Sequence, residues 1–248
     1  MTLPDTLAFE RAGLRAWPGI EVEWDGAWVR RASGRYTKRS NSVQCFDPAD
    51  EDDAEMRILA AARWMQQRDL PPVMRITPLT GPGVLAALDR LGWRDVEPCQ
   101  LLAMPLGPTE PDPRVRLFDL LDPVFLDIQQ RLQAYSDQTA AGMRALLERV
   151  DIPAAGLVAY AGDVPVASAL MDVADGIAVA GNVVTDPAFR RQGLAGAVMR
   201  SGLAWAHGLG AHTAALNVVG DNHGAQALYR GMGYTRQYDY SYRIPGAL

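Results

Sequence analysis

The stretch Val184-Thr-Asp-Pro-Ala-Phe-Arg-Arg-Gln-Gly-Leu-Ala-Gly196 decides how this chain folds. An apolar run from 176 to 184 leads into it and an apolar-periodic segment through Trp205 follows, which predicts a strand, a small-residue turn and a helix of about fifteen residues. Such a turn leaves backbone N–H groups unpaired at the positive end of the helix dipole. With Arg190 and Arg191 beside them, these groups predict an anion-binding cradle.

Two familiar phosphate-binding patterns do not fit this stretch. A dinucleotide fold needs G-x-G-x-x-G and a P-loop needs G-x-x-x-x-G-K-[ST], and neither is present. Instead, Arg190-x-x-Gly193-x-Ala195 resembles the [QR]-x-x-G-x-[GA] pyrophosphate loop of the GNAT superfamily of acyl-CoA-dependent N-acetyltransferases.

A second motif strengthens the resemblance. Residues 213–218 predict a short buried strand, Asn222 lies in a turn, and residues 225–230 predict a short helix that carries Tyr229. Gly231-Met-Gly-Tyr234 ends that helix with a glycine in the C′ position. This order is similar to the C-terminal part of a GNAT domain.

Composition bounds the possible functions. A length of 248 residues favours two lobes, and a net charge of −5 argues against nucleic acid as the main partner. No apolar run approaches the ~20 residues of a membrane span, and the N-terminus lacks the pattern of a signal peptide. We therefore expect no membrane partner. Cys45 and Cys99 lack metal-ligand spacing, so we expect no bound metal, and free thiols in a cytoplasmic protein.

Four prolines and a glycine between 104 and 113 predict a linker. We therefore expect an N-terminal lobe (1–106), a linker (107–113) and a catalytic domain (114–248). The second domain is predicted to run β-α-α-β-β-β-α-β-α-β, a mixed α/β sheet of the GNAT acyltransferase fold. The elements expected there are strands at 114–119, 155–161, 165–173, 176–184 and 213–218 and a final strand, with helices at 123–135, 138–150, 194–205 and 225–230.

The N-terminal lobe echoes part of this pattern. A helix at 54–68, a strand at 73–77 and a helix at 83–91 are expected, and Gly92-Trp93 aligns with Gly233-Tyr234. On that register Leu88 replaces Tyr229, and no R-x-x-G-x-A turn is present. The lobe is therefore interpreted as a degenerate second GNAT unit without its own acyl-CoA site.

The resemblance implies acetyl-CoA as co-substrate. Cradle amides would hold its pyrophosphate, and the end of the strand together with Asn222 would hold its pantetheine arm. Tyr229 would act as the general acid that protonates the leaving thiolate. A bulge in that strand would free an N–H for the developing oxyanion. The cofactor-binding residues implied are Val183, Val184, Thr185, Arg190, Arg191, Gln192, Gly193, Leu194, Ala195, Gly196 and Asn222.

The general base is open. Many relatives carry a glutamate where this chain has Asn217, so either another carboxylate such as Asp172 acts through water or the amine arrives neutral. His207 is expected to complement a helix C-terminus, His212 to precede a strand on the wrong side, and His223 to have at most a contact with the cofactor.

The acceptor is open as well, with a small-molecule amine or a peptide as candidates. The basic run from Arg30 to Arg39 either borders the cleft and attracts an anionic acceptor or the cofactor's 3′-phosphate, or is the solvated face of a hairpin with Gly34 at its tip. Trp24 and Trp28 flank this run and are expected to lie in the core. Because no base is evident, a non-catalytic acyl-CoA sensor or scaffold is the alternative function. The oligomeric state is open between a monomer and a homodimer.

Overall fold

The computed structural model describes residues 2–34 and 36–246. The first elements are α1 (Thr6–Ala16), β1 (Glu21–Asp25), β2 (Trp28–Ala32), β3 (Val43–Cys45), α2 (Ala54–Gln66), β4 (Met74–Ile76), α3 (Pro82–Arg90) and β5 (Trp93–Pro105). They are followed by β6 (Val115–Asp119), α4 (Pro123–Gln133), α5 (Asp137–Leu147), β7 (Ala154–Ala161), β8 (Val164–Ala174), β9 (Ile177–Thr185), α6 (Leu194–Gly208), β10 (Thr213–Val219), α7 (His223–Gly231) and β11 (Thr235–Pro245). Single-turn 3-10 helices cover Lys38–Ser40 and Pro187–Phe189.

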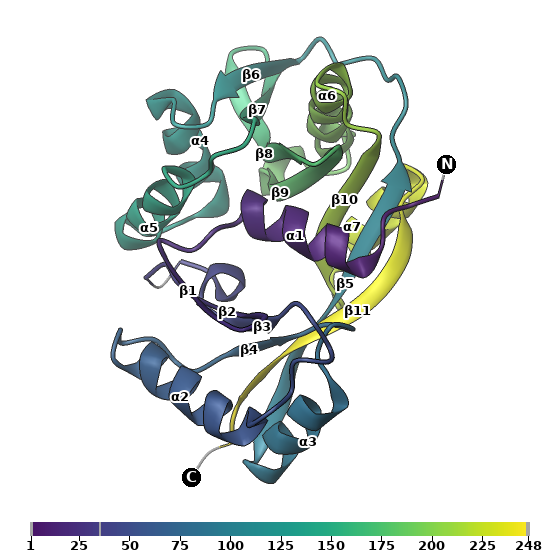
Figure 1. Cartoon of the computed structure of the whole chain (residues 1–248). Coiled ribbons are helices and arrows are strands. Elements are labelled where there is room, and N and C mark those ends of the chain that lie inside the picture. Colours follow the sequence, from purple (N-terminus) through teal and green to yellow (C-terminus); the bar gives the residue numbers. More distant parts are fainter. Residues whose placement is uncertain (1, 35, 247–248) are drawn as a thin grey trace.

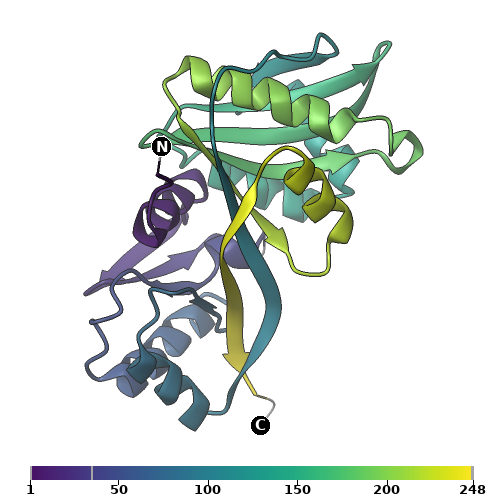
Figure 2. The same cartoon turned by 90° about the vertical axis from the view of Figure 1, so that its right-hand side faces the viewer.

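The strands of the described residues form one eleven-stranded sheet in the order β1-β2-β3-β4-β11-β5-β10-β9-β8-β7-β6. The long antiparallel strands β5 and β11 run through both halves of the molecule (Figures 1 and 2). Because β11 pairs with β4 on one side and β5 on the other, the end of the chain is built into the N-terminal half. The sheet is thus continuous across the proline-rich segment, and the division at 107–113 stays a prediction.

The predicted element order of the C-terminal half is confirmed. Helix α6 packs on one face of β7–β9, while α1 and α4 cover the other face (Figure 1). Successive residues of β8 explain both contacts, because Met171 joins the core under α6 and Leu170 joins the core under α4. A strand that is buried on both faces requires the near-continuous apolar run seen in the sequence.

The N-terminal half contains α2, β4 and α3 where the sequence predicted them. Gly92 and Gly233 both adopt positive φ (+70° and +99°), each between a short helix and a long strand, as expected for a repeated unit. Helix α1 and the strands β1, β2, β3 and β5 were not predicted from the sequence. β1 is mostly exposed and β3 has three residues, so neither carries a readable hydrophobic period.

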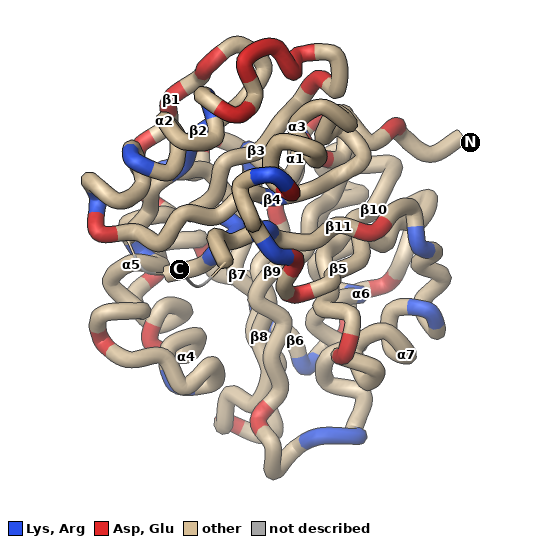
Figure 3. The backbone as a smooth tube through the Cα atoms, turned by 90° about the horizontal axis from the view of Figure 1, so that it is seen from below, with Lys and Arg blue, Asp and Glu red and all other residues tan. Residues whose placement is uncertain are grey.

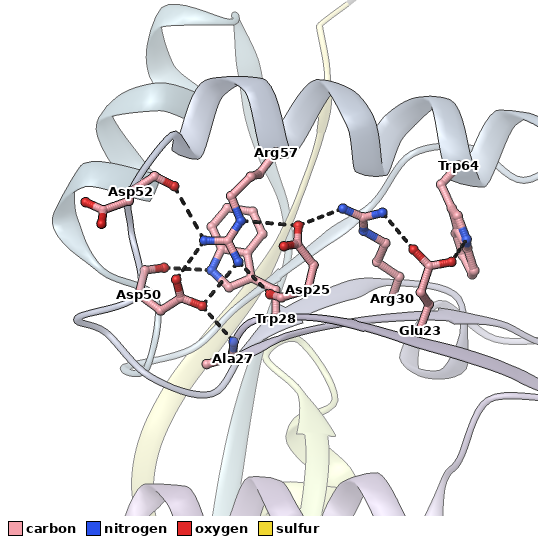
Figure 4. A network of polar contacts seen from close by, with 9 residues as sticks. All are labelled: Glu23, Asp25, Ala27, Trp28, Arg30, Asp50, Asp52, Arg57 and Trp64. Atoms are coloured by element: carbon pink, nitrogen blue, oxygen red, sulfur yellow. Dashed lines mark hydrogen bonds and ion pairs between the residues drawn. The ribbon is translucent and has the colours of Figure 1, made fainter.

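A polar network fastens α2 to the edge of the sheet (Figure 4). The Arg57 guanidinium lies 4.2 Å from the Trp28 ring centroid and donates to the Asp50 and Asp25 carboxylates over 2.8 and 3.2 Å. Arg30 donates to the same Asp25 carboxylate over 2.7 Å. The Arg57 hydrogen bonds, together with that of the Ala27 amide, lower the pKa of Asp50 despite some desolvation. Asp50 therefore holds α2 through Arg57, one turn into the helix, and does not cap its N-terminus.

Acidic residues gather ahead of α2, at the top of Figure 3, where residues 47–55 contain six carboxylates and no basic residue. Elsewhere both signs occur close together along the chain. Among the described residues, no helix combines the length and the apolarity needed to cross a bilayer.

Candidate active site

The site lies where two parallel strands separate. β9 and β10 pair with each other only from Ile177–Thr213 to Ala180–Leu216. Beyond that point β9 stays paired with β8 and β10 with β5, but the two strands no longer pair with each other. The register between β8 and β9 shifts here, so that Asn182 and Val183 together oppose Ala169. Asn182 has φ of +49°, and such a bulge bends β9 away from its neighbour. We call this opening the fork; Asn217 is the first β10 residue beyond it.

The predicted cradle follows β9. Asp186 caps the 3-10 turn by accepting a hydrogen bond from the Ala188 amide over 2.9 Å. Arg191 and Gly193 both have positive φ (+63° and +73°), and Gly193 is the N-cap of α6. The first intrahelical bond runs from the Ala197 amide to the Gly193 carbonyl. The amides before Ala197 therefore precede the helical ladder and point outward from the helix end.

A pocket of about 580 Å³ opens between the cradle and α7 and is called the cradle pocket. It brings together every predicted cofactor-binding and catalytic residue except Gln192, and Gly224, Ala225 and Leu228 join them. Its lining residues are Val183, Val184, Thr185, Arg190, Arg191, Gly193, Leu194, Ala195, Gly196, Asn222, Gly224, Ala225, Leu228 and Tyr229.

The caps of α7 hold Tyr229 in this pocket. At the N-cap, the Asn222 side-chain oxygen accepts from the Ala225 amide over 3.1 Å, which leaves its NH₂ group for a ligand. At the other end, the Tyr234 and Gly233 amides donate to the carbonyls of Tyr229 and Arg230, the Schellman pattern predicted from the glycine. Tyr229 is 6% exposed, and burial raises its pKa to about 12. The phenol is therefore protonated at neutral pH.

The opposite face of the fork carries groups that sequence reasoning missed. Leu216 and Val218 of β10 join the core under α6, so Asn217 between them faces the side of the sheet that α1 covers. It accepts a hydrogen bond from Arg75 over 3.4 Å, and Arg75 forms an ion pair of 2.9 Å with Glu10 on α1. The missed signal is an acidic residue on the apolar face of α1, beside Phe9.

A small hollow lies among these groups and is called the arginine pocket. It has room for about one water, with a volume of about 10 Å³. It is lined by Phe9, Glu10, Gly13, Leu14, Arg31, Arg39, Gln44, Arg75, Leu101 and Asn217.

The carboxylates near the fork differ in protonation. Burial opposes ionisation of Glu10, but the Arg75 charge and hydrogen bonds from Arg75, Tyr238 and Gln44 outweigh burial, so its pKa lies below the usual value. Asp172 is fully buried on β8, and burial raises its pKa well above the usual value despite the opposing Arg39 charge. Glu10 is thus an ionised carboxylate whose oxygens already accept hydrogen bonds from Arg75, Gln44 and Tyr238, whereas Asp172 favours its neutral form.

The predicted candidates outside the motif are placed differently. His207 lies in the last turn of α6, where the sequence expected it. His212 lies beside Gly176 and Thr213 ahead of β10, and the exposed His223 is not among the lining residues of the cradle pocket. In the basic run, Arg31 is buried and Lys38 pairs with Glu97, so the run is not a uniformly solvated face; Arg35 lies outside the described residues.

The fork, the cradle and the buried tyrosine define the class of protein: the chain is a GNAT-superfamily N-acetyltransferase. The family described as "Probable histone acetyltransferase Rv0428c C-terminal" matches residues 5–243, and the chain belongs to this family.

Comparison with individual proteins supports this assignment over the whole chain. The "Uncharacterized N-acetyltransferase YobR" of Bacillus subtilis (strain 168) is 26% identical over 248 residues, which span 98% of this chain and 99% of that protein. The solved "GCN5-related N-acetyltransferase from Kribbella flavida" has a TM-score of 0.71 at 19% identity, covering 97% of this chain and 94% of that one. A "Tandem GNAT protein from the clavulanic acid biosynthesis pathway" has a TM-score of 0.67 at 12% identity, covering 99% and 89%. The predicted tandem GNAT fold is confirmed.

Proposed function

We propose that this acetyltransferase moves an acetyl group from acetyl-CoA to a primary amine by direct attack of the amine on the thioester. The observation that carries the proposal is that one pocket joins an unpaired helix N-terminus, the open end of β9 and the buried phenol of Tyr229. Each of these groups meets one need of the reaction: binding, orientation and proton supply.

The cradle would bind the pyrophosphate of acetyl-CoA. A Cβ built at Gly193 meets no atom within 4 Å, so phosphate oxygens have space to approach the main chain. Hydrogen bonds to a charged group contribute about 1.5–3 kcal/mol each, whereas the helix dipole contributes about 0.3–1 kcal/mol at the surface. The amides of Arg191, Gln192, Gly193, Ala195 and Gly196 would therefore supply most of the affinity, assisted by the Arg190 and Arg191 charges.

The end of β9 would orient the thioester. The backbone of Val183, Val184 and Thr185, which has no partner strand on the β10 side, would bind the pantetheine amides together with the free NH₂ group of Asn222. The bulge at Asn182 and Val183 leaves backbone N–H groups out of regular register. One of them would donate to the oxygen that becomes negative during attack.

In the transfer step the amine nitrogen forms a bond to the acetyl carbon and the carbon–sulfur bond breaks. Tyr229 would donate a hydrogen bond, and then its proton, to the departing thiolate. The nitrogen loses its proton to water or to a base.

None of the groups at the fork is an obvious base. Asn217 is a neutral amide, and the Glu10 carboxylate is already occupied by Arg75, Gln44 and Tyr238. Asp172 stays a candidate, because a raised pKa brings a carboxylate nearer to neutral pH. An α-amino group with pKa near ~8 needs the least help, so such an amine is the favoured nucleophile.

The test is thiol release from acetyl-CoA, measured across a panel of primary amines at about pH 7 to about pH 9. We expect amine-dependent release that rises as each amine becomes neutral. Acetyl-CoA binding without release for any amine would contradict transfer and support the alternative, an acyl-CoA sensor or scaffold.

We also propose a cytoplasmic location and a monomer or homodimer. Cys45 and Cys99 are both free and buried. Burial raises the pKa of Cys45 to about 12 and that of Cys99 above its usual value, which lowers the reactivity of both thiols. Free thiols suit a reducing compartment.

A further inference from the structure

Arg31 is a buried cation without a counter-ion. Its side chain is 1% exposed, and its hydrogen bonds go to the Trp17 carbonyl, Ser42 and Gln44, which are all neutral. Its Nε has no hydrogen-bond partner, and no carboxylate of the described residues forms an ion pair with it. Burial and the nearby Arg75 charge lower its pKa to about 10, although Tyr242 and the Glu10 charge oppose this shift in part, so Arg31 still carries a charge at neutral pH.

The surroundings of Arg31 do not balance this charge. Of the three arginines that line the arginine pocket, Arg75 is neutralised by Glu10. Arg39 lies over the Trp17 ring, 5.4 Å from its centroid, and within residues 2–34 and 36–246 it forms no ion pair. The pocket therefore has a surplus of positive charge, and buried charges of one sign are normally matched by a partner.

The pocket lies beside the reaction site. Asn217 lines it and is the residue after Leu216, where β10 last pairs with β9, so the pocket begins roughly 3.4 Å beyond the fork. On β9, Val183 of the cradle pocket is three residues past Ala180, roughly 10 Å along the strand. The two pockets thus open on opposite faces of one fork, and the arginines come from β2, β4 and the Lys38–Ser40 turn of the N-terminal half.

We propose that the acceptor is a small amine that carries a carboxylate, and that Arg31 and Arg39 bind this carboxylate while the amine reaches the thioester through the fork. The inference rests on the proposed acetyl transfer and names its substrate class. One carboxylate oxygen would take the place of the single water for which the pocket has room and would pair with the unused Arg31 Nε. The lysine side chain of a protein acceptor would instead bring a cation to a pocket that is already positive.

The test compares amines in matched pairs. Thiol release from acetyl-CoA is measured with α-, β- and γ-amino carboxylates and with the carboxamide of each, at pH values that give equal fractions of neutral amine. Because one charge-assisted hydrogen bond is involved at least, the KM for the carboxylate should be lower by about tenfold or more. Arg39→Gln removes one of the two cations, so it should weaken this preference and leave the KM for acetyl-CoA unchanged. Arg39 is only half-buried, so this variant should fold.

Lys38→Gln is the matched control, because it removes a neighbouring positive charge that pairs with Glu97 outside the pocket. It should keep the carboxylate preference. Equal KM values for carboxylates and carboxamides in the wild type would overturn the inference while leaving acetyl transfer intact.

If no amine is acetylated, the proposed function fails and binding alone decides the inference. Calorimetry with the same amines in the presence of coenzyme A should then show the carboxylates binding more tightly to the wild type than to Arg39→Gln. Equal binding of carboxylates and carboxamides would overturn it.

Discussion

Replacing Tyr229 by Phe tests the general acid while changing one atom. The ring is buried and packs edge-on against Tyr234, with centroids 5.9 Å apart, so phenylalanine preserves the packing. General acid catalysis contributes about 10²–10⁴-fold. A phenol with a pKa of about 12 is a weaker acid than free tyrosine, so the lower end of that range applies. We expect kcat to fall by about 100-fold, equivalent to about 2.7 kcal/mol of barrier.

The assay is steady-state thiol release, with acetyl-CoA affinity measured separately by calorimetry. The affinity should change by less than about twofold, because the hydroxyl acts in the transition state rather than in binding. A thioester with a more acidic thiol needs less protonation, so it should narrow the gap in kcat between Tyr229→Phe and the wild type. Tyr234→Phe is the matched control, since its hydroxyl is buried, has no hydrogen-bond partner and does not line the cradle pocket. Wild-type kcat in Tyr229→Phe would refute the assignment.

Three further outcomes follow from the same structure. Glu10→Gln should lower the free energy of unfolding by about 3–5 kcal/mol, measured by urea denaturation, because it leaves Arg75 charged and buried. The folded-state pKa of Glu10 lies below its unfolded value of about 4.5, so its ionic stabilisation should be complete above that pH and decline as the pH falls through the lower folded-state pKa. Since burial raises the pKa of Tyr229 to about 12, kcat should rise with amine deprotonation and not decline between about pH 7 and about pH 10; a fall within that range would point to another acid.

The C-terminal half was predictable because its signals are local. The run from Gly176 through the cradle to α6 combines an apolar strand, a glycine that must adopt positive φ and a helical period, and each is set by neighbours in sequence. The same holds for the caps of α7, where Asn222 accepts from the Ala225 amide and the Gly233 amide donates to the Arg230 carbonyl, both within five residues.

The other face of the fork was not predictable, because its contacts join distant segments. Glu10 and Arg75 are 65 residues apart, and Arg75 and Asn217 are 142 apart. The sequence marked the basic run but could not show that Arg31 points inward while Arg30 joins the network of Asp25 and Glu23. Strand periodicity assigns alternate faces, and only the tertiary fold decides which face is covered.

The sequence expectation for Trp24 and Trp28 shows the same limit. Both were expected to lie in the core, and Trp28 is fully buried, but Trp24 is 52% exposed on the edge strand β1. An edge strand has a neighbouring strand on one side only, so its other side and much of its surface face solvent.

The central claim is that the main chain around Gly193 grips the pyrophosphate of acetyl-CoA, and calorimetry on Gly193→Asp tests it most directly. Gly193→Asn has nearly the same shape without the charge, and Gly162→Asp places the same residue at a glycine with φ of +62° and open space outside the pocket. We predict micromolar binding by the wild type and by Gly162→Asp, and a loss of at least about 100-fold in Gly193→Asp with a smaller loss in Gly193→Asn. Undiminished acetyl-CoA binding by Gly193→Asp would contradict the account.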